Sequence, residues 1–146
     1  MSEQTQPRET LLKDIQLLVV EDEKDTRDLL RFLLTQHGAK VIAAENVPRA
    51  IAVFEEHRPD VILADIGMPG NDGFALIAYV RSVNATPVVA VTAYSNPEAR
   101  ERGLMAGFNA YLVKPFDPEE VVLTVRKLYD ERKPELSAAD YADDAD

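Results

Sequence analysis

The feature that most constrains the fold is a regular alternation between short apolar runs and segments in which apolar residues recur at helical spacing. The runs are four to six residues long, and several are rich in β-branched residues. None of them alternates polar with apolar residues, which is typical of strands that are covered on both faces of a parallel sheet. The five runs occupy residues 15–20, 40–44, 61–64, 88–91 and 110–113.

The segments between these runs have the features of helices. Asn96-Pro97 and Asp117-Pro118 are favourable helix starts, because Asn and Asp cap the first turn and proline fits into it. Five strand–helix units in a row predict parallel strands joined by right-handed crossovers, hence an α/β fold with a doubly wound sheet and helices on both faces. The first helix is expected to bury a single stripe made of Thr26, Leu29, Leu30, Leu33 and Leu34.

Composition and charge exclude several classes of function. The chain has 146 residues, no cysteine, no apolar run of transmembrane length and no secretion-signal layout at its N-terminus, which together favour the cytoplasm. A net charge of −10 argues against nonspecific binding to nucleic acid or to an anionic membrane. Glu21-Asp22-Glu23 follows the first strand where a dinucleotide site or a P-loop would need glycines.

A single domain is expected over residues 14–131. It would lie between an N-terminal arm, residues 1–13, and an acidic C-terminal tail, residues 132–146. Residues 131–146 carry six acids against two bases, or −4 of the net charge, which is typical of a solvated, disordered tail. The composition of the arm does not decide whether it docks on the domain.

Polar side chains follow four of the five predicted strands. Glu21 and Asp22 follow the first strand, Asp65 the third, Thr92 the fourth and Lys114 the fifth. The carboxyl ends of parallel strands meet at one edge, where sites form in such sheets. Clustered carboxylates without His or Cys favour Mg²⁺. A lysine and a hydroxyl facing them suit a phosphoryl group, for which aspartate is an adequate nucleophile.

The segments LLVVEDE, VILADIGMPGNDGF, PVVAVTAY and AYLVKPF, in this order, resemble the receiver domains of two-component response regulators. The resemblance covers about residues 14–131 and implies a flavodoxin-like fold with five parallel strands in the order 2-1-3-4-5. It implies a signalling switch that accepts a phosphoryl group from a histidine kinase or a histidine phosphotransfer protein, with Mg²⁺ or Mn²⁺ as cofactor. Such a chain catalyses only its own phosphorylation and slow dephosphorylation, so it is a switch and not an enzyme with turnover.

The resemblance also implies a role for each acidic residue of the site. Asp65 is the expected phospho-acceptor and also a metal ligand. Asp22 is the expected direct metal ligand, Glu21 acts through water, and Gly67 supplies its backbone carbonyl. Many relatives have aspartate at the position of Glu21, and the longer side chain is expected to preserve metal binding.

The resemblance also implies roles for residues in and after the fourth and fifth strands. The resemblance implies that Thr92 and Lys114 bind the phosphoryl oxygens and that the Lys114–Pro115 peptide bond is cis. Tyr111 occupies the position of an aromatic switch that turns inward as Thr92 moves, although simple core packing explains a tyrosine there equally well.

The resemblance implies that two positions beside the acceptor set how fast the phosphoryl group is hydrolysed. Gly67 has no side chain, and Tyr94, two residues after Thr92, is bulky. We therefore expect Tyr94 to shield the phosphoryl group in part from attacking water.

Output is expected to pass through protein contacts on the face formed by the helix that starts at Asn96-Pro97, the strand 110–113 and the helix that starts at Asp117-Pro118. The chain would be a monomer or a phosphorylation-dependent dimer. No output domain follows residue 131, so the chain is expected to be a stand-alone receiver or one separated from a hybrid kinase.

Two alternatives from other classes stay open at this point. One is a phosphohydrolase with Asp65 as turnover nucleophile, as in haloacid-dehalogenase-like enzymes. Those enzymes have a second acid two residues after the nucleophile, where this chain has Gly67. The other is a pseudo-receiver, a binding module of the same fold that is never phosphorylated.

Overall fold

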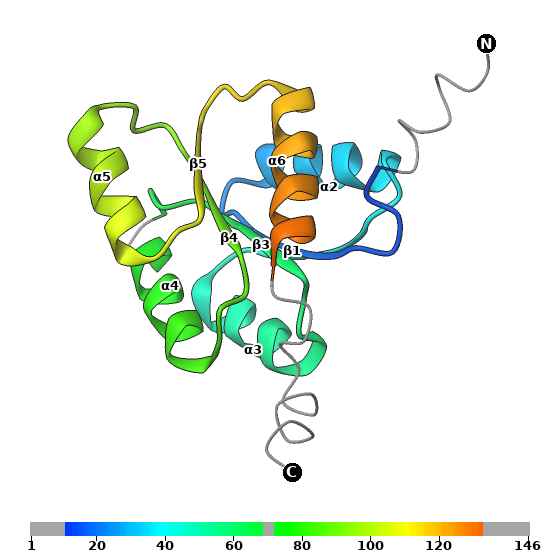
Figure 1. Ribbon diagram of the computed structural model, residues 1–146, viewed down its shortest axis with the longest axis horizontal. Helices are drawn as coiled ribbons and strands as arrows, with labels where there is room; N and C mark the ends of the chain where they lie inside the picture. Colours follow the sequence, from blue (N-terminus) through cyan, green and yellow to red (C-terminus); the bar gives the residue numbers. More distant parts are fainter. Residues whose placement is uncertain (1–10, 69–71, 133–146) are drawn as a thin grey trace.

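The computed structural model describes residues 11–68 and 72–132, which form a five-stranded parallel sheet between two layers of helices (Figure 1). The sheet order is β2-β1-β3-β4-β5, so the predicted fold class and strand order are confirmed. The strands are β1 (Gln16–Val20), β2 (Lys40–Ala44), β3 (Val61–Ala64), β4 (Val88–Thr92) and β5 (Ala110–Val113). The helices are α2 (Lys24–Gln36), α3 (Val47–His57), α4 (Asp72–Val83), α5 (Pro97–Ala106) and α6 (Pro118–Glu131).

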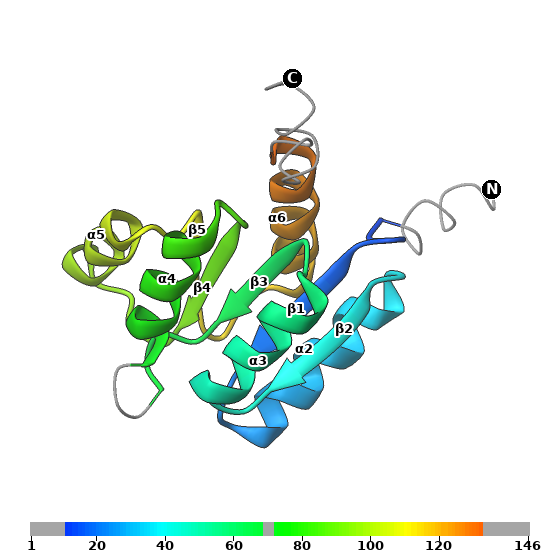
Figure 2. The same cartoon turned by 90° about the horizontal axis from the view of Figure 1, so that it is seen from below.

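The helices divide between the two faces of the sheet. Helices α2 and α6 cover one face and α3, α4 and α5 the other (Figures 1 and 2). Successive side chains of a strand point to opposite faces. In β1, Leu18 and Val20 pack with the α3 and α4 side, and Leu17 and Val19 pack with the α2 and α6 side. Burial of each such side chain stabilises the fold by roughly 1.5–3 kcal/mol, which explains the continuous apolar runs.

Capping side chains fix where α3, α5 and α6 begin. The side chain of Asn46 accepts a hydrogen bond from the backbone N–H of Arg49 at the start of α3. Asn96 caps α5 and Asp117 caps α6 in the same manner, each followed by a proline in the first turn. The starts of α5 and α6 agree with the prediction, and they fix the segments that follow β4 and β5.

Helix α2 departs from the predicted stripe. Leu30 and Leu34 are buried against the sheet, whereas Leu29 is 53% exposed. Phe32, on the same helix, is 64% exposed. The inward assignment of Leu29 was therefore wrong. The reason is that leucines at four positions between 29 and 34 cover more of the helix surface than one sheet face and α6 can bury.

The packed part of the chain begins before residue 14. Leu12 is fully buried, and its N–H donates to the carbonyl of His37 at 2.9 Å. Arg126 of α6 donates to the carbonyl of Leu11 at 3.1 Å. The end of the predicted arm is thus docked on the domain, and the predicted acidic tail lies outside the described residues except for Arg132. A membrane-spanning helix is not found anywhere within residues 11–68 and 72–132.

Candidate functional site

The carboxyl ends of the central strands bring the predicted site residues to one edge of the sheet. Hydrogen bonds between neighbouring chain segments continue just beyond the strands. The N–H of Asp65 donates to the carbonyl of Val20 at 3.0 Å, and the N–H of Lys114 donates to the carbonyl of Thr92 at 2.8 Å. The backbone of each site residue is therefore held by a neighbouring strand end, which gives the side chains a fixed spacing.

Three carboxylates gather at this edge. Glu21, Asp22 and Asp65 each present an oxygen within 4.8 Å of the other two. Glu21 and Asp65 are buried, and Asp22 is exposed. Like charges this close repel unless a cation is shared, and a set of oxygen ligands without His or Cys suits a hard ion. The exposed side of the cluster leaves room for the waters that Mg²⁺ retains, so these residues fit Mg²⁺.

Lys114 supplies one positive charge to the cluster. Its Nζ donates to Glu21 Oε1 at 2.8 Å and to Asp65 Oδ2 at 3.1 Å. Burial alone would lower the pKa of Lys114, but the two carboxylates raise it above its ordinary value. Burial raises the pKa of Glu21, an effect that the hydrogen bond from Lys114 opposes in part. Lys114 is therefore charged at neutral pH, and its single charge faces three carboxyl groups.

Two glycines lie close to Asp65, and one of them is required by the close approach of the backbone. The N–H of Gly67 donates to Asp65 Oδ1 at 2.8 Å. A Cβ on Gly73, in the first turn of α4, would lie 2.5 Å from the Cα of Ile66 and 2.7 Å from the carbonyl oxygen of Asp65. No side chain fits there. The Asp72-Gly73 pair is the feature of the sequence that could have identified this requirement.

Arg27 is a further residue that sequence reasoning missed. Its Nη1 donates to the carbonyl of Glu21 at 2.9 Å and to that of Asp22 at 3.3 Å. The Glu21 carboxylate in turn accepts from the N–H of Glu23 at 3.1 Å. These bonds fix the turn that carries both acids. Nothing in the sequence signals this, because the contact depends on how α2 leaves the turn.

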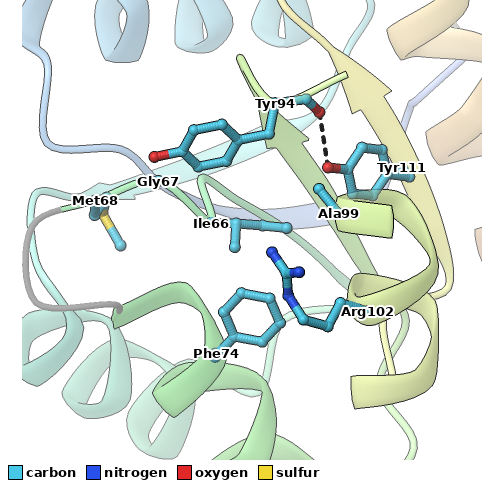
Figure 3. A pocket seen from close by; sticks show the side chains of 8 residues that line it. All are labelled: Ile66, Gly67, Met68, Phe74, Tyr94, Ala99, Arg102 and Tyr111. Atoms are coloured by element: carbon cyan, nitrogen blue, oxygen red, sulfur yellow. Dashed lines mark hydrogen bonds between the residues drawn. The ribbon is translucent and has the colours of Figure 1, made fainter. Parts of the chain in front are cut away.

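Thr92, Tyr94 and Tyr111 form a chain of contacts on the other side of Asp65. Thr92 is fully buried, and its Oγ1 accepts from the N–H of Tyr94 at 3.2 Å. The hydroxyl of Tyr111 donates to the carbonyl of Tyr94 at 2.8 Å, as the dashed line in Figure 3 marks. Tyr111 is only 6% exposed, so its ring lies inward. Gly67 lies beside the Tyr94 ring, because a Cβ there would be 3.4 Å from Tyr94 Cε2.

A cavity of about 250 Å³ adjoins these residues, between α4 and α5. The guanidinium of Arg102 points into it, near Phe74 and Ile66 (Figure 3). The cavity is lined by Ile66, Gly67, Met68, Phe74, Tyr94, Ala99, Arg102 and Tyr111.

Just after β5, the peptide bond between Lys114 and Pro115 is cis.

Comparison with known proteins identifies the family. Residues 17–126 match the family described as response regulator receiver domain. The "uncharacterized 14.6 kDa protein in sodA1 3′region" of Leptolyngbya boryana is 43% identical over 119 residues, which cover 80% of this chain and 91% of that protein. The transcriptional regulatory protein ResD of Bacillus subtilis is 42% identical over 115 residues, which cover 79% of this chain and 48% of ResD.

The solved structures agree with the sequence relatives. The receiver domain of the Francisella response regulator 1452 matches with a TM-score of 0.77 at 30% identity, over 82% of this chain and 100% of that one. The chain spans about half the length of the curated transcriptional regulators that it matches. With the sheet order and the acidic cluster at its edge, these matches lead to one conclusion. The chain belongs to the response regulator receiver domain family of two-component signalling.

Proposed function

We propose that this chain is a phospho-accepting switch in which Asp65 takes a phosphoryl group from the phosphohistidine of a histidine kinase or histidine phosphotransfer protein. In this proposal Asp22, Asp65 and the Gly67 carbonyl hold Mg²⁺ directly, and Glu21 holds it through water. The observation that supports it best is the buried Asp65 carboxylate, which lies beside two further acids and 3.1 Å from the Lys114 ammonium.

The proposed transfer needs positioning and charge stabilisation more than covalent chemistry from the protein. A carboxylate oxygen of Asp65 forms a bond to phosphorus while the phosphorus–nitrogen bond of phosphohistidine breaks, and the imidazole leaves and takes up a proton. Lys114 already bonds Asp65 Oδ2, so it is near the oxygens of a group attached there. The Thr92 hydroxyl accepts from Tyr94 and keeps its own hydrogen for a phosphoryl oxygen. Bound Mg²⁺ would offset the charge on the same oxygens.

The phosphoryl group would act as a switch through the hydrogen bonds that link Thr92 to Tyr94 and Tyr94 to Tyr111. A new anion on Asp65 attracts Thr92, and the β4–α5 loop follows because the Tyr94 N–H bonds the threonine. That loop leads directly into helix α5, which is followed along the chain by strand β5 and helix α6. The face formed by α5, β5 and α6 has exposed apolar side chains, which suit it to a protein partner or to a second copy of the chain. These side chains are Leu104, Met105 and Leu123.

A second surface suits the phosphodonor protein. Leu29 and Phe32 are exposed one turn apart on α2, next to Phe116 of the β5–α6 loop. Two adjoining grooves share Leu29 and Phe116, and one of them extends to Lys114 and Pro115 at the acceptor site. A donor must bring its phosphoryl group to Asp65, so it has to cover the rim of the acceptor site, meaning the edge where the carboxyl ends of the strands present Glu21, Asp65 and Lys114. An apolar surface continuous with this rim gives such a protein its contact area.

The central test is phosphorylation of the purified chain. We expect acetyl phosphate with Mg²⁺ to add one phosphoryl group, detected by intact mass, and omission of Mg²⁺ to suppress it. Asp65→Asn should abolish the modification, and Asp25→Asn, at an exposed position on α2, should not. A folded chain that no donor modifies would be a pseudo-receiver. Steady release of phosphate from small monoesters would instead indicate a hydrolase.

Donor docking can be separated from chemistry. Phe32→Ser is expected to slow transfer from a phosphorylated histidine phosphotransfer protein at least tenfold, a loss of about 1.4 kcal/mol at the interface. Acetyl phosphate makes no contact with α2, so its reaction should be unchanged. Leu123→Ser, on α6, is a matched control because that side chain is 49% exposed. Equal slowing with both donors would contradict the docking surface.

Shielding by Tyr94 is testable in the same way. The Tyr94 ring lies beside Gly67, so Tyr94→Ala should open the acceptor to water and speed dephosphorylation several-fold. Tyr94→Phe keeps the ring and should behave like the unaltered chain. An unchanged rate in Tyr94→Ala would rule out shielding.

A further inference from the structure

Gly103 is an unusual residue in α5. It lies in the interior of the helix and is buried. A glycine in a helix interior costs about 0.5–1 kcal/mol relative to alanine, because it loses more chain entropy. Its backbone does not need glycine, since the positive-φ glycines among the described residues are Gly38 and Gly107. The reason for a glycine at position 103 must therefore be space.

That space is taken by the ring of Tyr111. A Cβ on Gly103 would lie 3.2 Å from Tyr111 Cε2 and 3.3 Å from Cδ2. These separations are shorter than ordinary carbon–carbon contacts of about 3.5–4.0 Å. The third neighbour is Ile66 Cδ1 at 3.6 Å, an ordinary contact. The space that a methyl group on residue 103 would need is therefore occupied by one edge of the Tyr111 ring.

Two other contacts restrain the ring within its site. The Tyr111 hydroxyl donates to the carbonyl of Tyr94 at 2.8 Å. The guanidinium of Arg100 lies 5.8 Å from the ring centroid, within the range of a cation–π contact. A methyl group on residue 103 would press the ring to shift by a few tenths of an ångström against these two contacts.

We propose that Gly103 is a positioning residue whose missing side chain lets Tyr111 lie inward in the unmodified chain, so that the switch tyrosine is preset before Asp65 accepts a phosphoryl group. The significance for signalling rests on the proposed function; the position of Tyr111 does not. With Tyr111 preset, the β4–α5 loop is already held at Tyr94, and modification acts mainly through Thr92. The unmodified chain then presents part of the α5–β5–α6 face in its switched form.

The first experiment uses thermal unfolding of the full chain without any phosphodonor, so its result does not depend on whether Asp65 is phosphorylated. Gly103→Ala should lower the melting temperature by a few degrees in the presence of Tyr111. In a Tyr111→Ala background the same substitution should raise it, because only the helix-propensity gain remains. A shift of the same sign in both backgrounds would overturn the proposal.

The second experiment follows the ring itself. The chain contains five tyrosines, so fluorotyrosine labelling gives a small ¹⁹F spectrum in which Tyr111→Phe assigns the signal. Gly103→Ala should move the Tyr111 signal toward that of an exposed tyrosine. Met105→Ala, at an 80% exposed position of the same helix, should leave it in place. An unmoved signal in Gly103→Ala would mean that the site accommodates the methyl group without displacing the ring and that Gly103 does not position it.

Discussion

Two half-buried cations, Arg81 and Lys114, hold different parts of this molecule, and their partners differ in kind. Arg81, at the end of α4, donates to neutral oxygens. Two of its nitrogens bond the carbonyl of Gly107 at 3.1 and 2.8 Å, one bonds the carbonyl of Thr86 at 2.8 Å, and one bonds Asn109 Oδ1. Lys114 donates instead to two carboxylates at the opposite edge of the sheet.

The difference separates a scaffold from a site. Arg81 ties the end of α4 to the start of β4 and to the turn before β5, where φ of Gly107 is +117°. Burial lowers the pKa of Arg81, but its partners need no cation to be stable. The partners of Lys114 are carboxyl groups that repel one another when both are charged, so a cation between them is favourable. The scaffold satisfies its own polar groups, whereas the acidic cluster at the other end of the sheet fits a bound cation.

The comparison predicts its largest effect for Arg81→Met. The substitution keeps the apolar stem but leaves buried carbonyl oxygens without donors, which should lower the free energy of unfolding by about 2–3 kcal/mol. Urea denaturation measures this. The control is Lys127→Met, since the exposed ion pair of Lys127 with Glu131 spans 3.9 Å and should contribute less than about 0.5 kcal/mol. Equal effects of the two substitutions would contradict the scaffold role of Arg81.

Lys114→Met should show a different pattern. Without Mg²⁺ we expect a loss of about 1–2 kcal/mol, because Glu21 and Asp65 then face each other without a counter-charge, while solvent at the rim relieves part of the repulsion. Added Mg²⁺ should stabilise this variant more than the unaltered chain, since binding to the folded state alone raises stability. Arg81→Met should gain no extra stabilisation. If Mg²⁺ stabilises all three proteins equally, the rim does not depend on a cation.

The residues that gather at the acceptor site could be predicted from the sequence far better than the hydrogen bonds of Arg81. Glu21, Asp65, Thr92 and Lys114 each follow an apolar strand, and parallel strands bring such positions together whatever the details of packing. The partners of Arg81 belong to loops whose meeting depends on how α4 and α5 pack. A hydrogen bond to a backbone carbonyl also leaves no residue pattern in the sequence.

Periodicity alone was insufficient to place residues in two helices. In α2, which has more apolar residues than one buried face accepts, the spacing of leucines could not decide that Leu30 lies inward and Leu29 outward. In α5 the few small apolar residues predicted no positioning role for Gly103, because that role depends on the position of the Tyr111 ring. Strand periodicity fared better, since every strand here is covered on both faces.

The smallest expected effect, with the opposite sign, belongs to Glu21→Gln. Burial raises the pKa of Glu21, so the folded chain binds a proton there more readily than the unfolded chain does. The stability that this group contributes is present below its ordinary pKa and is lost as pH rises through the raised value. Glutamine resembles the neutral form, so at neutral pH without Mg²⁺ the free energy of unfolding should stay unchanged or rise by at most about 1 kcal/mol.

The same substitution should weaken Mg²⁺ binding about tenfold, or about 1.4 kcal/mol, measured by the shift of the urea midpoint with Mg²⁺ concentration. Glu45→Gln, exposed at the end of β2, is the matched control for charge. If Glu21→Gln destabilised the protein as much as Lys114→Met, Glu21 would serve as the structural partner of the lysine. If Glu21→Gln leaves the free energy of unfolding unchanged but weakens Mg²⁺ binding, the buried carboxylate at this edge of the sheet serves cation binding and not the stability of the fold.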